Sequence, residues 1–210
     1  MTDKFENLES DKKKRILDAA YREFAEQGFA QASTNRIVKE AGIGKGMLFY
    51  YFKSKQELFN YLVEHGLEFV MKEYLSQLDT NQPDFIERYR LAAVNKLNAY
   101  VKYPHVFNFF GNLYMNNLEG VPPELAERVN KLQAEGFAKL FTDIDTSLFR
   151  KDIPHEQILK LIQWSMDGYT NELLASLKDR NLTEVDFDPY WQDFFEFLQV
   201  LRKIYYENNH

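Results

Sequence analysis

The chain has 210 residues, a formal net charge of −6, 45% hydrophobic residues and no cysteine. This size and composition are typical of a soluble globular protein of one or two domains, and no apolar run is long enough to span a membrane. The lack of cysteine excludes disulfides, thiol catalysis and zinc–thiolate sites, and with the polar N-terminus it leads us to expect a cytoplasmic protein.

Helical periodicity runs through the whole chain, and alternating strand patterns are scarce, which predicts an all-α fold. The nine expected helices cover residues 11–27, 34–41, 45–52, 55–78, 83–103, 104–118, 122–149, 154–180 and 189–208. Gly28 is a natural stop for the first helix. Prolines stand at the start of each of the last five helices, where the missing N–H would be unpaired in any case.

Charge is distributed unevenly along these elements. Residues 1–60 hold 11 Lys/Arg against 9 Asp/Glu, a net of +2, and the remaining residues carry a net of −8. The basic segment favours contact with nucleic acid, and the acidic remainder leans toward cationic ligands.

The second and third expected helices are joined by the short segment AGIGK, which is typical of a helix-turn-helix. On a helical wheel Leu48 and Phe52 fall on one face and Gly46 and Tyr50 on the other. The apolar face can pack on the domain while the other enters a major groove.

From Arg15 to Leu58 the chain resembles the N-terminal domain of TetR-family transcriptional repressors. The matching elements are ILxAAxxxFAxxG in the first helix, IxKEAGI in the second, and KGxLxYYFxSKxxL from the third into the fourth. The resemblance implies a DNA-binding helix-turn-helix domain over residues 1–54. It also implies a helical domain for effector binding and dimerisation over residues 55–210.

The resemblance implies DNA contacts from two helices and their flanks: Ser33, Thr34, Asn35, Lys45, Gly46, Met47, Tyr50, Tyr51 and Lys55. Ser33 is expected to cap the second helix with its side chain, and Lys55 to meet a phosphate. Arg36 lies at the third position of that helix, where a cation opposes the helix dipole. We therefore hypothesise that Arg36 is used on DNA and not for local stability.

Aromatic residues are abundant beyond residue 60, and the family resemblance implies a small-molecule cavity among the middle helices. The candidates for its wall are Tyr100, Phe107, Phe110, Tyr114, Phe137, Phe141 and Trp164. Pockets and packed helix interfaces are both lined by such residues, so plain core packing remains the alternative for each of them.

The final helix carries two apolar stripes, so it needs two burial partners. The resemblance implies that the last two helices pack against their copies in a homodimer. The expected interface residues are Ile158, Ile162, Met166, Gly168, Tyr169, Leu173, Phe194, Phe197, Leu198 and Leu201.

The helix-turn-helix and the family resemblance together lead us to expect a ligand-responsive repressor. We expect it to bind a palindromic DNA operator as a homodimer and to be released by a small-molecule effector. The histidines show no metal-ligand spacing, and no catalytic constellation or cofactor fingerprint is present, so we expect no metal, no cofactor and no enzymatic activity. The alternatives are a helical adaptor protein and an all-helical enzyme.

Overall fold

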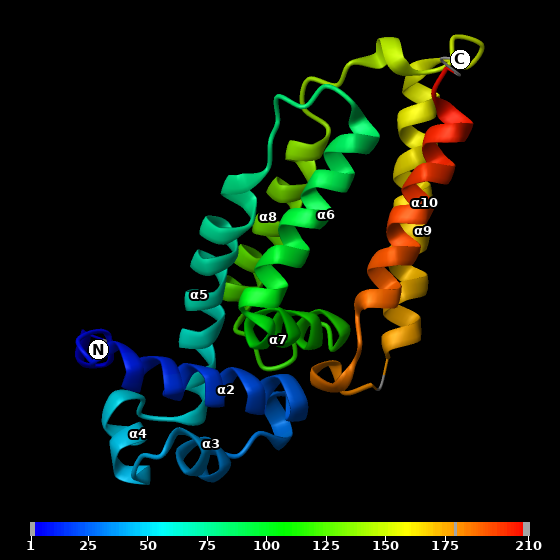
Figure 1. The fold of residues 1–210 in the computed structure, drawn as a ribbon. Helices are drawn as coiled ribbons and strands as arrows, with labels where there is room; N and C mark the ends of the chain where they lie inside the picture. The colour runs from blue at the N-terminus through cyan, green and yellow to red at the C-terminus, as the bar shows by residue number, and fades with distance from the viewer. Residues whose placement is uncertain (1–2, 179, 208–210) are drawn as a thin grey trace.

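The computed structural model describes residues 3–178 and 180–207, and this part of the chain is helical throughout, without a β-strand (Figure 1). The α-helices are α1 (Asp3–Glu6), α2 (Ser10–Gln31), α3 (Thr34–Ala41), α4 (Lys45–Tyr51), α5 (Lys55–Glu73), α6 (Phe85–Lys102), α7 (Pro104–Met115), α8 (Pro123–Leu140), α9 (His155–Leu177) and α10 (Asp188–Tyr205). Three single 3-10 turns join them: η1 (Leu75–Gln77), η2 (Thr146–Leu148) and η3 (Leu182–Glu184). Every helix of the described residues is too short or too polar to be a membrane-spanning segment.

The helices form two groups, which we call the head (residues 3–54) and the body (residues from 55 onward). In Figure 1 the head, with α2, α3 and α4, lies at one end of the molecule, and α5, α6 and α8 run away from it. The helices α9 and α10 form a separate pair, and α7 lies crosswise between α2 and the rest of the body. The predicted domain boundary after residue 54 remains a prediction.

The fold class is confirmed, and most predicted helix starts are close to the observed ones. Proline occupies the first turn of α7, α8 and α10, and Pro154 directly precedes α9. The predicted stop at Gly28 corresponds to a kink, because Gly28 has φ 64° and ψ 177° inside α2. This backbone conformation lies in the region that favours glycine.

Several predicted helix ends are too late. The chain leaves α8 at Leu140 and not near 149, because Asp143 takes a left-handed φ of 49° and Phe149 forms an isolated β-bridge with Tyr206. The helices α5 and α9 end at Glu73 and Leu177. The predicted end of the last helix at 208 lies outside the described residues.

Two hydrophobic cores correspond to different parts of the fold. The first core joins the head to the start of α5, to α7 and to the start of α8. The second core joins α6, α9 and α10 with the end of α8. The first core therefore crosses from the head into the body, and α7 is the helix on which the head rests.

Candidate nucleic-acid interface and ligand cavities

A tight turn connects α3 to α4. Gly42 ends α3 in the left-handed conformation, with φ 65° and ψ 40°, and its N–H donates to the carbonyl of Lys39 at 3.3 Å. The next N–H, of Ile43, donates to the carbonyl of Val38 at 3.0 Å. These bonds satisfy carbonyls at the end of α3, and the glycine reverses the chain without strain.

The helix α4 has one buried and one exposed side. Leu48 and Phe52 are each 1% exposed, as the helical wheel predicts, and they fix α4 to the head. On the other side Met47 and Tyr50 are 36% and 61% exposed, and Lys45 is exposed as well. A Cβ added at Gly46 would meet nothing within 4 Å. We call Lys45, Gly46, Met47 and Tyr50 the exposed tip.

The exposed tip is supported by α1, a helix that the sequence pattern did not predict. Phe5 is fully buried, and its ring centroid lies 5.6 Å from that of Tyr51 and 4.8 Å from that of Phe52. The ammonium of Lys4 lies 4.3 Å from the ring centroid of Tyr50, which places a further cation beside the tip. A single phenylalanine in a polar N-terminal segment was the only sequence signal.

The start of α3 is capped differently from the prediction. The side chain of Ser33 makes no capping hydrogen bond, so that expectation is wrong. Instead the N–H of Ser33 donates to Oε1 of Glu23 at 2.6 Å, and Glu23 is buried on α2. Thr34 and Asn35 follow at the start of α3, half-buried and exposed respectively, and their DNA contacts remain predictions.

Arg36 also binds Glu23. Its Nη2 donates to Oε1 at 2.6 Å and its Nε to Oε2 at 2.9 Å, a bidentate arrangement. The expectation that Arg36 has no local stabilising role is therefore wrong, because this pair joins α3 to α2. The Arg36 side chain is 54% exposed, so contact with DNA remains a prediction.

Lys55 has a structural role that the sequence did not predict. Its ammonium donates to the carbonyls of Phe29, Ala30 and Ala32 at 2.8, 3.1 and 3.2 Å. An ammonium has three donors, and all three are used here to cap the end of α2. The phosphate contact of Lys55 stays a prediction. Tyr51 is only 8% exposed, and a phosphate contact from its hydroxyl stays a prediction.

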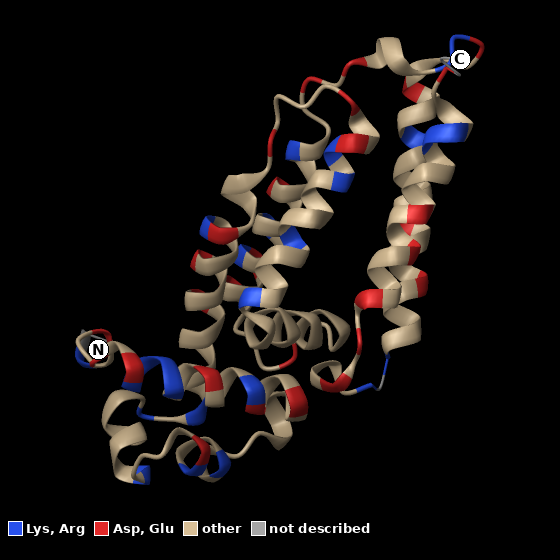
Figure 2. Ribbon diagram, viewed as in Figure 1, with Lys and Arg blue, Asp and Glu red and all other residues tan. Residues whose placement is uncertain are grey.

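Charged residues are spread along the head. Figure 2 shows Lys and Arg along α2 and at the outer ends of α3 and α4, interspersed with Asp and Glu. Contact with a DNA backbone is favoured by cations of this kind beside an exposed tip.

The body contains two mainly apolar cavities. The α6/α9 cavity has a volume of about 360 Å³ and is lined by α6, α7, α9 and the start of α10. The α5/α8 cavity has a volume of about 370 Å³ and is lined by α5, α7 and α8. Tyr74, Lys96, Phe107 and Leu140 line both, so these residues form the partition between them.

Five of the seven aromatic candidates line a cavity. Tyr100 lines the α6/α9 cavity and Phe107 lines both. The α5/α8 cavity is lined by Phe110, Tyr114 and Phe137. Their contact with an effector remains a prediction.

Two of the aromatic candidates line neither cavity. Phe141 packs against Phe85, with ring centroids 5.0 Å apart, at the edge of the second core. Trp164 is 58% exposed on α9, with the ammonium of Lys160 5.2 Å from its ring centroid. Their contact with an effector is untested, and their positions show that an aromatic residue on a helix can face the core or the solvent as well as a pocket.

Polar groups in the wall of the α6/α9 cavity lack partners. The hydroxyl of Tyr89 and the indole nitrogen of Trp191 are buried and make no hydrogen bond with the described residues. Such a group costs about 1–3 kcal/mol of stability. Burial raises the pKa of Tyr74 to about 12, and burial also lowers the pKa of Lys96. Lys96 was missed from the sequence, although it lies seven residues after Tyr89 on the inward face of α6.

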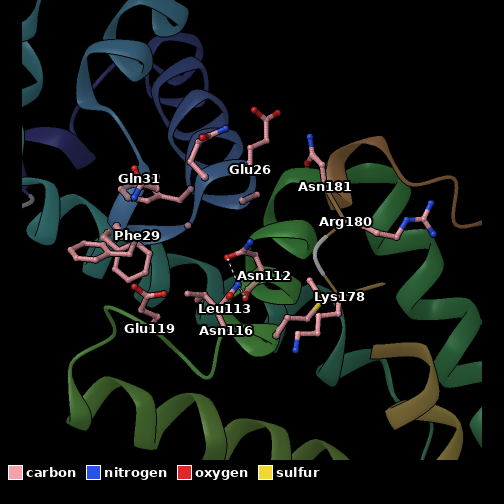
Figure 3. A pocket seen from close by; sticks show the side chains of 17 residues that line it. Glu26, Phe29, Gln31, Asn112, Leu113, Asn116, Glu119, Lys178, Arg180 and Asn181 are labelled. Atoms are coloured by element: carbon pink, nitrogen blue, oxygen red, sulfur yellow. Dashed lines mark hydrogen bonds between the residues drawn. The ribbon is translucent and has the colours of Figure 1, made fainter. Parts of the chain in front are cut away.

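A third, polar cleft lies at the joint between head and body (Figure 3). It is bordered by the end of α2, by α7 and by residues on both sides of position 179. In Figure 3 the carboxylates of Glu26 and Glu119 lie around it together with Asn112 and Asn116, whose side chain donates to the carbonyl of Asn112 at 2.9 Å. The cleft reaches the edge of the first core, because Phe24, Phe59 and Leu113 are among its lining residues.

The predicted dimer interface is largely internal. Ile158, Ile162, Met166, Leu198 and Leu201 are at most 5% exposed and belong to the second core of a single chain. These five expectations are wrong, because the sequence shows an apolar stripe but not which partner covers it.

The remaining interface candidates are divided. Tyr169, Leu173 and Phe194 line the α6/α9 cavity, and Phe197 stacks on Tyr169 with centroids 4.9 Å apart. Gly168 is exposed, and a Cβ there would meet nothing within 4 Å. A second apolar stripe is exposed on α9 and α10, which we call the outer stripe: Leu161, Trp164, Val200 and Ile204.

Comparisons with known proteins agree with the geometry of the head. Residues 16–62 match the family model described as "Bacterial regulatory proteins, tetR family". An HTH-type transcriptional regulator of Staphylococcus aureus (strain USA300) is 27% identical over 183 residues, covering 77% of this chain and 90% of the relative.

Solved structures share the fold over almost the whole chain. A TetR family transcriptional regulator from Chloroflexus aurantiacus has a TM-score of 0.60 at 19% identity, covering 98% of each chain. The regulator FadR from Bacillus subtilis, solved in complex with stearoyl-CoA, has a TM-score of 0.52 at 17% identity, covering 90% of this chain and 96% of that one. The family match over residues 16–62 and the related regulators support a TetR-family DNA-binding transcriptional regulator, and the solved structures show that the chain shares the fold of such regulators.

Proposed function

We propose that the protein is a ligand-responsive repressor, which binds a palindromic operator in the cytoplasm as a homodimer and is released by a small-molecule effector. The observation that carries this proposal is the position of α7. Its residues Val106, Phe109 and Leu113 belong to the first core, together with the head. Its residues Phe107 and Phe110 line the cavities. An effector that fills a cavity thus packs against the helix that supports the head.

The contacts between α7 and the head are direct. The ring centroid of Phe109 lies 5.2 Å from that of Tyr21 and 5.6 Å from that of Phe59. A small rotation of α7 would therefore move α2 and α5 together, since packed cores do not deform continuously. An effector shifts this equilibrium only by its different affinity for the two arrangements, and about 5.5 kcal/mol is needed to go from 1:99 to 99:1.

In the proposed homodimer, two exposed tips meet successive major grooves about 34–36 Å apart. The outer stripe of α9 and α10 supports the dimer, because its apolar side chains are exposed in the single chain. A substitution of Trp164 by Glu should shift the protein toward monomer in sedimentation at micromolar concentration. The control is Val101→Glu, because Val101 is 72% exposed on α6, away from this stripe. A wild-type monomer, or equal effects of the two variants, would contradict the dimer.

The effector we propose is a small molecule with a large apolar part, since the walls of both cavities are mainly apolar and aromatic. The complex of the Bacillus subtilis regulator with stearoyl-CoA supports a ligand of this kind in the same fold.

DNA binding is tested by selecting fragments of genomic DNA on the purified protein and footprinting those that it retains. We expect protection of two half-sites on one face of the duplex, with affinity that falls steeply as salt rises. Tyr50→Ala and Met47→Ala should each weaken binding by about 1–3 kcal/mol. The control Lys131→Ala removes a cation from α8 and should change little. Absence of protection would favour the helical adaptor.

A further inference from the structure

One face of α6 is turned toward the cavities, and a lysine stands in the middle of it. Tyr89, Lys96 and Tyr100 follow one another at spacings of seven and four residues and line the α6/α9 cavity. Lys96 also lines the α5/α8 cavity, in the partition between the two. At this spacing the three residues share one side of a helix, which is otherwise an apolar and aromatic wall.

Lys96 has no counter-charge in the described part of the chain. Neither cavity is lined by an Asp or a Glu, and no hydrogen bond or ion pair of Lys96 occurs among the described residues. Lys96 is an exposed residue, so water reaches its side chain, while the protein packed around the ammonium lowers its pKa by desolvation. A cation in a largely apolar and aromatic wall favours an anion as its partner.

Two more donors in the α6/α9 cavity wall lack acceptors. The indole N–H of Trp191, on α10, is buried without a hydrogen-bond partner, and so is the hydroxyl of Tyr89, a residue only 7% exposed. An indole nitrogen and an ammonium can only donate. Both atoms are enclosed by the residues around them, so Lys96 is the charged donor that a ligand in the cavity can reach.

We propose that the effector is a singly charged anionic amphiphile, whose carboxylate binds Lys96 while its apolar part fills the α6/α9 cavity. This inference rests on the proposed function and specifies its ligand class. A single cation favours a single charge, because a ligand with several phosphates would leave most of its charge buried without a partner. The charge in the cavity wall is positive, whereas the body as a whole is acidic. The preference for cationic ligands that the acidic sequence suggested therefore does not apply to the α6/α9 cavity.

The test uses three probes with the same chain length: dodecanoate, 1-dodecanol and dodecylammonium. Each is titrated against the purified full chain carrying Trp164→Phe, which leaves Trp191 in the cavity wall as the single remaining tryptophan, since the chain has two. We expect dodecanoate to change the Trp191 emission and to bind at least about tenfold more tightly than 1-dodecanol, with dodecylammonium weakest. Equal binding of dodecanoate and 1-dodecanol would overturn the proposal, and so would tightest binding of dodecylammonium.

Variants locate the anion. Lys96→Met should abolish the preference for dodecanoate while 1-dodecanol still binds, which also shows that the variant is folded. Lys96→Arg should keep the preference. The control Lys131→Met removes an exposed lysine of α8, whose side chain is 75% exposed, and should bind as the parent does. A preference that survives in Lys96→Met, or is lost in Lys131→Met, would show that Lys96 is not the anchor.

Measuring whether a ligand releases the protein from DNA distinguishes a failure of the carboxylate site from a failure of the proposed repressor function. If dodecanoate displaces the parent protein from its selected DNA but not Lys96→Met, both are supported. If the protein binds DNA and is released by an uncharged ligand only, the anion proposal fails and the repressor stands. If dodecanoate binds through Lys96 without changing DNA affinity, the carboxylate site stands and ligand-controlled repression fails.

Discussion

The head and the body are both rich in aromatic residues, but they use them differently. In the first core the rings close against one another, with centroids 5.0 Å apart for Phe24 and Phe59 and 4.8 Å for Phe29 and Phe59. In the body the rings surround cavities of about 360 and 370 Å³ and leave the buried Tyr89 hydroxyl and Trp191 indole nitrogen without partners.

This difference fits the functions that we propose for the two regions, DNA binding by the head and ligand binding by the body. A close-packed core holds its side chains in single rotamers, and the exposed tip needs such a support to keep its geometry. A ligand cavity without its ligand has looser packing and unpaired polar groups, and the bound ligand fills the space and pairs with those groups. Aromatic content by itself therefore does not distinguish a packed core from a ligand cavity. The two regions differ in whether side chains fill the space between the rings.

The largest expected effect comes from two phenylalanines on α7. Phe109 is 1% exposed in the first core, so Phe109→Ala should lower the free energy of unfolding by about 3–5 kcal/mol. Phe107 borders both cavities and already lacks neighbours on that side, so Phe107→Ala should cost less than about 2 kcal/mol. Urea denaturation of both variants measures the difference, and equal losses would break the comparison between filled and open regions.

A pair of glycines tests how closely α5 packs against α7. A Cβ at Gly66, on α5, would lie 2.4 Å from the ring of Phe110, so Gly66→Ala should destabilise the protein by about 1–3 kcal/mol. The control is Gly168→Ala on α9, where the same methyl meets nothing within 4 Å and should stabilise by about 0.5–1 kcal/mol. Opposite signs in thermal unfolding are expected, and a neutral Gly66→Ala would mean that α5 and α7 are loosely packed.

A carboxylate in the closed part of the body gives a smaller effect. Asp84 begins α6, and its side chain accepts from the N–H of Glu87 at 3.0 Å, the hydroxyl of Tyr206 at 2.7 Å and Nη2 of Arg202 at 2.6 Å. Asp84→Asn should cost about 1–2 kcal/mol at neutral pH. In the control Asp152→Asn the lost partner is Arg150, also at 2.6 Å, but the Asp152 side chain is 63% exposed and no measurable change is expected.

The same variant predicts a pH dependence. Burial by itself raises the pKa of Asp84, but the bonds from Glu87, Tyr206 and Arg202 outweigh it and hold this pKa below its ordinary value. A depressed pKa contributes stability above the unfolded value of about 3.9, and this is lost as pH falls through the folded value. The stability difference between wild type and Asp84→Asn should therefore be constant from pH 7 to about 4 and shrink below. A difference that shrinks already between pH 7 and 5 would contradict this.

The smallest expected effect has the opposite sign. Lys96→Met places an apolar side chain in a largely apolar cavity wall, so it should stabilise the ligand-free protein in urea denaturation, by no more than about 0.5 kcal/mol because Lys96 is exposed. Lys131→Met on the outside should leave stability unchanged. A destabilised Lys96→Met would mean that the aliphatic part of the lysine supports the wall and that the open region is packed more like the head.

The sequence by itself determined the local features of this protein. The helix-turn-helix between residues 34 and 51, the burial of Leu48 and Phe52 and the proline starts of the later helices depend on residues close in sequence, so periodicity and turn chemistry were sufficient. The motif from Arg15 to Leu58 also carried the resemblance to the TetR family, since its spaced elements all lie in one continuous segment.

Tertiary structure decided which partner each of these faces meets. Lys55 reaches the carbonyls of Phe29, Ala30 and Ala32, and Glu23 binds Arg36, because chain segments far apart in sequence were brought together. The apolar stripe of Ile158 and Ile162 packs inside one chain, and Lys96 lines two cavities. A helical pattern fixes which residues share a side, but packing alone determines whether that side faces a core, a cavity or the surface.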